Sequence, residues 1–104
     1  MILINIDINI DKHKLMNILD KAIVEYKPIY YVISYDNFEK IKHVKPFECY
    51  YTKILGMVFG YSGMFIKHDF TLENNIIIGI RTLDDYNKFQ RYMKIKTLKE
   101  KIGI

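Results

Sequence analysis

The residues best suited to do chemistry in this chain are its three histidines, its single cysteine and its twelve acidic side chains. The histidines, His13, His43 and His68, lie far apart, and none has a second metal-binding residue at helical or strand spacing. Cys49 could act as a nucleophile only if folding brought a histidine to it, and a lone cysteine among aromatic residues is typical of core packing. The sequence therefore predicts no metal site, no cofactor and no covalent catalysis.

Two groups of acidic residues have a spacing that suggests a metal-dependent nuclease. Asp7 and Asp11 fall near the end of the first predicted strand, where such nucleases often place an aspartate, but a solvated strand edge and a helix cap explain them equally. Asp20, Glu25 and Lys27 mimic a second nuclease pattern, yet they lie on one predicted helix, whereas that pattern needs neighbouring strands. No catalytic residue is predicted, and we expect a protein that is not an enzyme.

Three glycines cluster closely enough to suggest a phosphate-binding loop. Such a loop lies between a strand and a helix, whereas Gly56, Gly60 and Gly63 lie between two predicted strands. The segment is more simply a bent hairpin with a glycine-rich turn at residues 60–63, where another backbone could approach. No nucleotide-binding motif is predicted.

The chain is basic, with a formal net charge of +4 and a pI near 9.1. Basic residues are enriched toward its end, where they could neutralise phosphates, and tyrosines on predicted strands and turns could stack on unpaired bases. The predicted contact residues for a nucleic acid or another partner are Lys88, Arg91, Lys94, Lys96, Lys99, Tyr30, Tyr50 and Tyr61. The competing interpretation is a solvated lysine-rich helix and tyrosines that pack in a sheet.

Length and composition indicate one globular domain over residues 1–104, since 50% of the residues are hydrophobic and the chain is too short for a second core. A single cysteine favours an intracellular, cytoplasmic location. Asp7 and Asn9 interrupt the apolar start, so no signal peptide is predicted, and no apolar run is long enough to cross a membrane. Abundant Ile, Lys, Asn and Tyr are typical of AT-rich genomes, which suggests a virus or mobile element and, if so, the host cytoplasm.

Hydrophobic spacing predicts the elements of the first half. Isoleucines at every even position predict a half-exposed strand over Ile2–Ile10, followed by Asp11 as a helix cap. An apolar stripe predicts a helix over Lys12–Lys27, which a proline then stops. A segment rich in β-branched and aromatic residues predicts a strand over Ile29–Tyr35, and a two-turn helix is expected over residues 37–45.

The second half predicts a sheet and one more helix. Phe47–Phe59 is expected to be extended, with a bend at Gly56. Met64–Leu72 and Ile76–Arg81 are expected to form a hairpin. Thr82 and the aspartate three residues later have the spacing of a capping box, which predicts a final helix.

These elements predict an α+β fold, a two-layer sandwich of a mainly antiparallel sheet of about five strands and two to three helices on one side. Their order loosely resembles the ferredoxin-like arrangement, with one helix and one strand too many.

We expect a small non-catalytic binding module that contacts a nucleic acid or a nucleic-acid-handling protein. The alternative is a protein-binding inhibitor or a homo-oligomeric accessory protein, such as a homodimer, without nucleic-acid contact. Salt dependence separates the two, because phosphate binding weakens steeply with salt.

Overall fold

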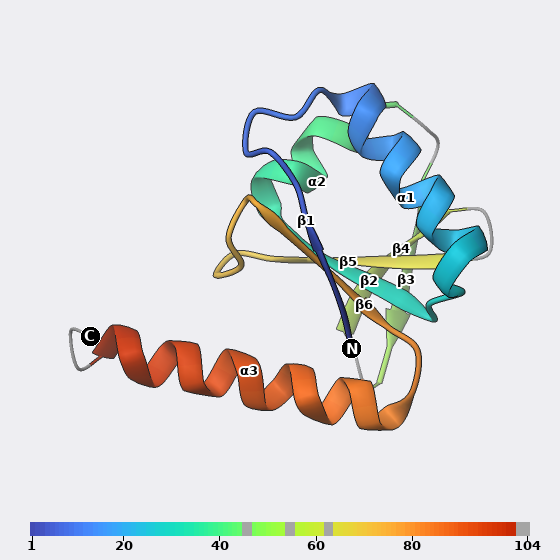
Figure 1. Ribbon diagram of the computed structural model, residues 1–104. Helices are drawn as coiled ribbons and strands as arrows, with labels where there is room; N and C mark the ends of the chain where they lie inside the picture. Colours follow the sequence, from blue (N-terminus) through green and yellow to red (C-terminus); the bar gives the residue numbers. More distant parts are fainter. Residues whose placement is uncertain (45–46, 54–55, 62–63, 102–104) are drawn as a thin grey trace.

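A computed structural model describes residues 1–44, 47–53, 56–61 and 64–101 of the chain. In these residues one sheet of six strands is accompanied by three helices (Figure 1). The elements are β1 (Ile2–Asn5), α1 (Lys12–Tyr26), β2 (Tyr30–Ser34), α2 (Tyr35–Ile41), β3 (Glu48–Thr52), β4 (Gly56–Tyr61), β5 (Met64–Asp69), β6 (Ile76–Ile80) and α3 (Leu83–Lys101).

The sheet has the strand order β1-β6-β2-β5-β4-β3. Only the pair β2–β5 is parallel, and the other four pairs are antiparallel, which confirms an α+β fold with a mainly antiparallel sheet. The sheet has six strands where about five were expected, and its order does not plainly follow the ferredoxin-like arrangement.

Strand β2 is the centre of the sheet, and its position overturns the predicted hairpin. Tyr30 of β2 pairs with Ile80 of β6 on one side and with Phe65 of β5 on the other, so β5 and β6 are separated by β2. All five residues of β2 are buried. A strand that is apolar on both faces is most stable where both faces are covered, and this long-range preference is stronger than the closeness of β5 and β6 in sequence.

One face of the sheet, here called the first face, carries Tyr31, Ile33, Ile66 and Ile77 and packs against α1 and α2. Asp11 caps α1 as predicted, since its carboxylate accepts a hydrogen bond from the His13 backbone N–H at 3.0 Å. The buried stripe of α1 that meets this face consists of Leu15, Met16, Leu19 and Ala22. These residues form the main hydrophobic core.

The second helix begins earlier than predicted, at Tyr35 instead of residue 37. The Ser34 hydroxyl accepts a hydrogen bond from the Asn37 backbone N–H at 3.1 Å, so Ser34 ends β2 and caps α2 at once. Asp36 lies in the first turn, where the helix dipole favours a negative charge. The proline-containing stop predicted at residues 45–46 lies outside the described residues.

The first strand is shorter than predicted and ends at Asn5 instead of Ile10. Asp7 forms a turn there, because its carboxylate accepts from the Asn9 backbone N–H at 2.8 Å and its carbonyl accepts from Ile10 at 3.0 Å. Asp69 likewise ends β5 before the predicted Leu72, since its carboxylate accepts a hydrogen bond from the Thr71 backbone N–H at 2.8 Å. The segment Phe47–Phe59, expected as one extended stretch with a bend at Gly56, is divided into the antiparallel neighbours β3 and β4, and Gly56 begins β4 with φ of 74°. Of the predicted turn at residues 60–63, residues 62 and 63 lie outside the described part.

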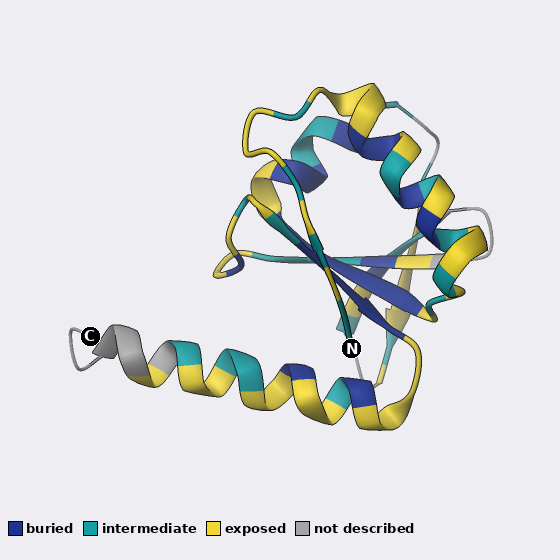
Figure 2. Cartoon of the chain, in the orientation of Figure 1, coloured by how far each residue is buried: buried dark blue, intermediate teal, exposed yellow. Residues whose placement is uncertain are grey.

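The opposite face of the sheet, here called the second face, carries Tyr30, Val32, Ile78 and Ile80 and packs against α3 through Phe89. Thr82 is confirmed as the helix cap, since its hydroxyl accepts a hydrogen bond from the Asp85 backbone N–H at 3.1 Å. The Asp85 carboxylate accepts from the Arg81 backbone N–H, where a full capping box would have that of Thr82. Figures 1 and 2 show α1 and α2 on one side of the sheet and α3 on the other, with the outward side of α3 exposed. Helices therefore cover both faces of the sheet, whereas the alternation in the first predicted strand favoured helices on one face only. Among the described residues, no helix is long and apolar enough to cross a membrane.

Candidate binding site

The predicted basic contact residues lie in different environments in the structure. Lys96 points toward the body of the protein, where its ammonium group lies 3.1 Å from the Glu73 carboxylate and also donates to the Thr71 carbonyl. Lys88 pairs with Asp84 on the same helix at 3.2 Å. Arg91 and Lys94 are exposed on α3, and the side chain of Lys99 lies outside the described residues. Two of the predicted contacts are thus ion-paired, and two face solvent.

The predicted tyrosines are also divided. Tyr30 and Tyr50 both lie on the second face. Tyr30 pairs with Phe65, Phe65 with Gly60 and Gly60 with Glu48, so these four residues share a face, and Tyr50 lies two residues after Glu48 on the same side of β3. Tyr30 is buried and Tyr50 is exposed. The backbone of Tyr61 ends β4, and its side chain lies outside the described residues. The residues of α3 that pack against Tyr30 and its neighbours are Tyr86, Phe89, Tyr92 and Met93, whereas Arg91 and Lys94 are exposed and are not part of that cluster.

Strand β3 lies at the edge of the sheet and pairs only with β4. Its exposed residues include Cys49, which is a correction to the predicted core packing of that side chain. Tyr51 is 78% exposed, and the Met57 side chain beside it on β4 is also exposed. Tyr51 and Met57 were not among the predicted contact residues. Their exposure follows from the edge position of β3, which depends on strand order.

Tyr50 lies flat against the second face next to this edge. An added Cβ at Gly60 would lie 2.7 Å from the Tyr50 ring, so only glycine lets the ring pack this closely. The ring also meets Phe65 edge-on, with 5.7 Å between ring centroids. Its hydroxyl donates a hydrogen bond to the Glu48 carboxylate, which raises the pKa of Tyr50. The β3 edge therefore presents aromatic side chains on both faces of the sheet.

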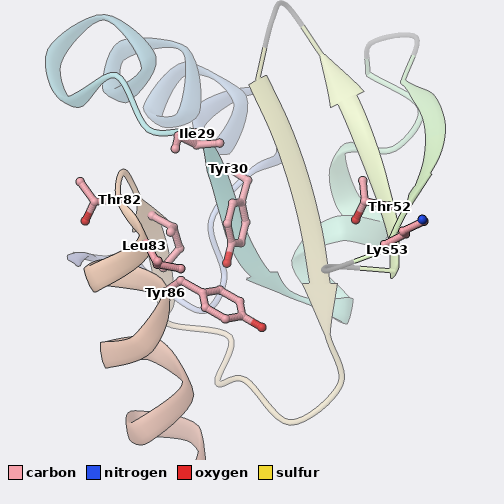
Figure 3. A pocket seen from close by; sticks show the side chains of 8 residues that line it. Ile29, Tyr30, Thr52, Lys53, Thr82, Leu83 and Tyr86 are labelled. Atoms are coloured by element: carbon pink, nitrogen blue, oxygen red, sulfur yellow. The ribbon is translucent and has the colours of Figure 1, made fainter.

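A cavity of about 430 Å³ opens on the second face between the start of α3 and the end of β3 at Thr52 and Lys53 (Figure 3). Its described apolar lining comes from Ile29, Ile80 and Leu83, and the aromatic rings of Tyr30 and Tyr86 contribute to the same walls. Figure 3 shows Thr52 and Lys53 across the opening from these residues, with the Lys53 ammonium group pointing away from Tyr30 and Tyr86. The lining residues are far apart in sequence, and no local pattern marks them.

Tyr30 and Tyr31 are adjacent on β2 and carry buried hydroxyl groups that have no hydrogen-bond partner among the described residues. Burial, with a smaller contribution from the neighbouring Tyr86, raises the pKa of Tyr30 to about 12. Burial also raises the pKa of Tyr31. Both hydroxyls are therefore protonated at neutral pH and can donate a hydrogen bond, but only Tyr30 lines the cavity.

His68 lies in an aromatic cluster on the first face, with ring centroids of Phe38 at 5.1 Å, Phe70 at 5.3 Å and Tyr35 at 5.4 Å. Its Nδ1 atom is buried without a hydrogen-bond partner among the described residues. Burial lowers the pKa of His68, and the neighbouring Lys67 lowers it further. The neutral imidazole is therefore the favoured form in the folded protein.

The acidic residues singled out in the sequence have structural roles. Asp7 forms a turn and Asp11 caps α1, and their carboxylates accept backbone hydrogen bonds. In the described part of the chain, no three His, Cys, Asp or Glu side chains are grouped closely enough to hold a metal ion. The chain matches no known family model, and no curated protein and no solved structure shows significant similarity to it.

Proposed function

We propose that this protein is a non-catalytic protein-binding module that pairs its edge strand β3 with an extended segment of a partner protein. The observation that carries the proposal is the exposure of β3, whose residues Glu48 to Tyr51 are all exposed at the edge of the sheet. The outer backbone groups of an edge strand recognise another extended chain, and alternate side chains then supply specificity.

The composition of β3 supports this choice. Edge strands that avoid pairing usually carry lysine or proline, or are very short. Strand β3 is five residues long and contains neither lysine nor proline, whereas β1, at the other edge, has four residues and is followed directly by the Asp7 turn. Tyr51 and Met57 add exposed apolar surface beside β3, of the kind that is enriched at protein interfaces.

Nucleic-acid binding is the second candidate, and the exposed Arg91 and Lys94 favour it. These two residues are one helical turn apart on α3 and are not ion-paired with any described residue. Tyr30 is buried beneath α3 and Tyr50 lies on the edge strand β3, so neither offers a stacking face on the same helix as these two cations. Binding through β3 requires no such second surface, and we therefore place it first.

The test uses random peptides about twelve residues long, displayed and selected on the immobilised full chain, then synthesised for measurement. Selected peptides should slow amide hydrogen exchange in β3. The double variant Cys49→Lys/Tyr51→Lys should weaken peptide binding at least about tenfold, because lysine on an edge strand disfavours strand pairing. Val24→Lys is the matched control, since Val24 is 77% exposed but lies on α1. It should leave the affinity unchanged.

Two further measurements decide between the candidates. Light scattering of the free protein over a range of concentrations determines whether the paired segment is β3 of a second copy. Oligonucleotide binding that falls steeply with salt and is lost in Arg91→Glu/Lys94→Glu would favour the nucleic-acid candidate. Peptide binding that survives in Cys49→Lys/Tyr51→Lys, without protection of β3 amides, would disprove pairing at this edge.

A further inference from the structure

Strand β3 carries opposite charges at its two ends. Glu48 begins the strand, and Lys53 directly follows its last residue, Thr52. Both charged side chains are exposed, and neither is ion-paired with any described residue. A strand with charges arranged in this way is complementary to a copy of itself that runs in the opposite direction.

The side chains between these ends also suit pairing with a second copy. When two identical edge strands pair antiparallel about a two-fold axis, each residue meets one from the same face of the sheet. The register centred on Tyr50 pairs all five residues of β3, so that Tyr50 lies opposite Tyr50 and Cys49 lies opposite Tyr51. Glu48 then lies opposite the residue before Lys53 of the other copy. No two like charges are opposite one another, and aromatic cross-strand pairs stabilise a sheet.

Pairing would cover the apolar surface that β3 leaves in water. Tyr51 is 78% exposed, and Met57, its neighbour on β4, is 55% exposed. In this register the Tyr51 side chains of the two copies are diagonal neighbours on the first face, a separation that aromatic side chains can bridge. A segment of a different protein would have to carry matching apolar and charged residues, which a second copy supplies by symmetry.

We propose that the segment paired with β3 is β3 of a second copy of this chain, in an antiparallel register centred on Tyr50. Glu48 of each copy pairs with Lys53 of the other, at both ends of the interface. This inference rests on the proposed function, strand pairing at β3, and adds the identity of the partner. Because five paired residues form a small interface, the dimer should be weak and depend on protein concentration.

The test measures the dimer dissociation constant of the full chain by sedimentation equilibrium. Glu48→Lys and Lys53→Glu should each weaken the dimer about fivefold or more, because each places like charges together at both ends. The double variant Glu48→Lys/Lys53→Glu and an equimolar mixture of the two single variants should both recover the wild-type affinity, since opposite charges meet again. Glu25→Lys is the matched control, because it makes the same change in net charge at an exposed position on α1, and it should leave the dimer unchanged.

Cross-linking checks the register. Residues directly opposite one another in antiparallel strands lie about 4.5–5.5 Å apart, within reach of a disulfide, whereas diagonal neighbours, such as Cys49 of the two copies, lie about 7–8 Å apart. With copper phenanthroline as oxidant, Cys49→Ser/Tyr50→Cys should therefore form a linked dimer at least about tenfold faster than the wild type, whose single thiol is that of Cys49. Faster linking in the wild type would overturn the register centred on Tyr50.

The remaining outcomes separate this inference from the proposed function. A protein that is monomeric at every concentration but still binds selected peptides through β3 would overturn pairing with a second copy and leave the proposed function intact. A dimer that persists in Cys49→Lys/Tyr51→Lys, or a mixture of Glu48→Lys and Lys53→Glu that stays monomeric, would also overturn it. A monomer that binds no peptide at β3 would overturn both.

Discussion

The two faces of the sheet differ in how completely helices cover them, and the neighbours Tyr31 and Tyr30 report that difference. Tyr31 lies on the first face in the core closed by α1 and α2. Tyr30 lies on the second face, where α3 packs and a cavity remains open. Both hydroxyls are buried without a partner among the described residues, but only Tyr30 lines the cavity.

This comparison separates residues that stabilise the fold from residues that are available for binding. On the first face, Leu15, Leu19 and Ile33 are fully buried and pack in one cluster. On the second face, Ile29 and Leu83 stay exposed beside buried neighbours. Exposed apolar residues at the opening of a cavity contribute little to the fold and are therefore free to bind.

The largest expected effect is a difference in stability between these two sets. Ile33→Ala should lower the free energy of unfolding by about 2–5 kcal/mol, because it leaves a cavity in a closed core. Leu83→Ala should lower it by less than about 0.5 kcal/mol, since Leu83 is 75% exposed. Urea unfolding followed by circular dichroism measures both values. Similar losses for the two variants would show that the second face is as tightly packed as the first.

Removal of the carboxylate that holds the start of α3 in place should have the next largest effect on the free energy of unfolding. Asp85 is buried, and its carboxylate contacts the Met1 amino group and accepts from the Arg81 backbone N–H at 3.0 Å. Asp85→Ala should lower the free energy of unfolding by about 1–3 kcal/mol, because the donors lose a charged acceptor.

The acid dependence provides the check on Asp85. The Met1 amino group, and to a lesser degree the Arg81 backbone N–H, hold the pKa of Asp85 below its ordinary value. A lowered folded-state pKa means that this stabilisation is present above the ordinary value of 3.8 and is lost as pH falls below it. Asp85→Ala should therefore lose less stability than the wild type in this acid range, and an unchanged acid limb would contradict the role of the carboxylate.

Local signals predicted the helices well, because the groups that define a helix end are close in sequence. Asp11 and Thr82 were identified as caps from their position alone, and both accept the expected backbone hydrogen bonds. Ser34 has the same function at α2 and was missed, since the polar residues after it suggested that the strand continued to Tyr35 and then broke.

Strand partners and the cavity could not be predicted, because they depend on residues far apart in sequence. The spacing of Phe65 and Ile78 gave no indication that Val32 would separate their strands. The cavity likewise joins Ile29, Lys53 and Tyr86, from three separate segments. The tyrosine pattern suggested binding, but only strand order reveals that Tyr30 is enclosed and Tyr51 is exposed.

A smaller effect on stability is expected from the titration of His68, whose side chain lies on the first face of the sheet. Burial, and secondarily Lys67, lower the pKa of His68, whereas Asp69 and Glu39 oppose the shift. Because the folded-state pKa is lowered, stability is fully present above the unfolded-state value of about 6.5 and falls as pH decreases through it. His68→Phe keeps a ring beside Phe38 and Phe70 and should flatten the stability profile between about pH 7 and pH 5. An equally steep profile in the variant would assign the dependence to another group.

The smallest expected effect tests the two tyrosines directly. Tyr30→Phe and Tyr31→Phe should each leave stability unchanged or raise it by up to about 1 kcal/mol, because each removes an unpartnered buried hydroxyl and preserves the ring. Urea unfolding of the two variants, followed by circular dichroism, measures both changes in stability. A clear loss of stability in either variant would show that its hydroxyl is hydrogen-bonded in solution and would contradict the unpartnered state of that group.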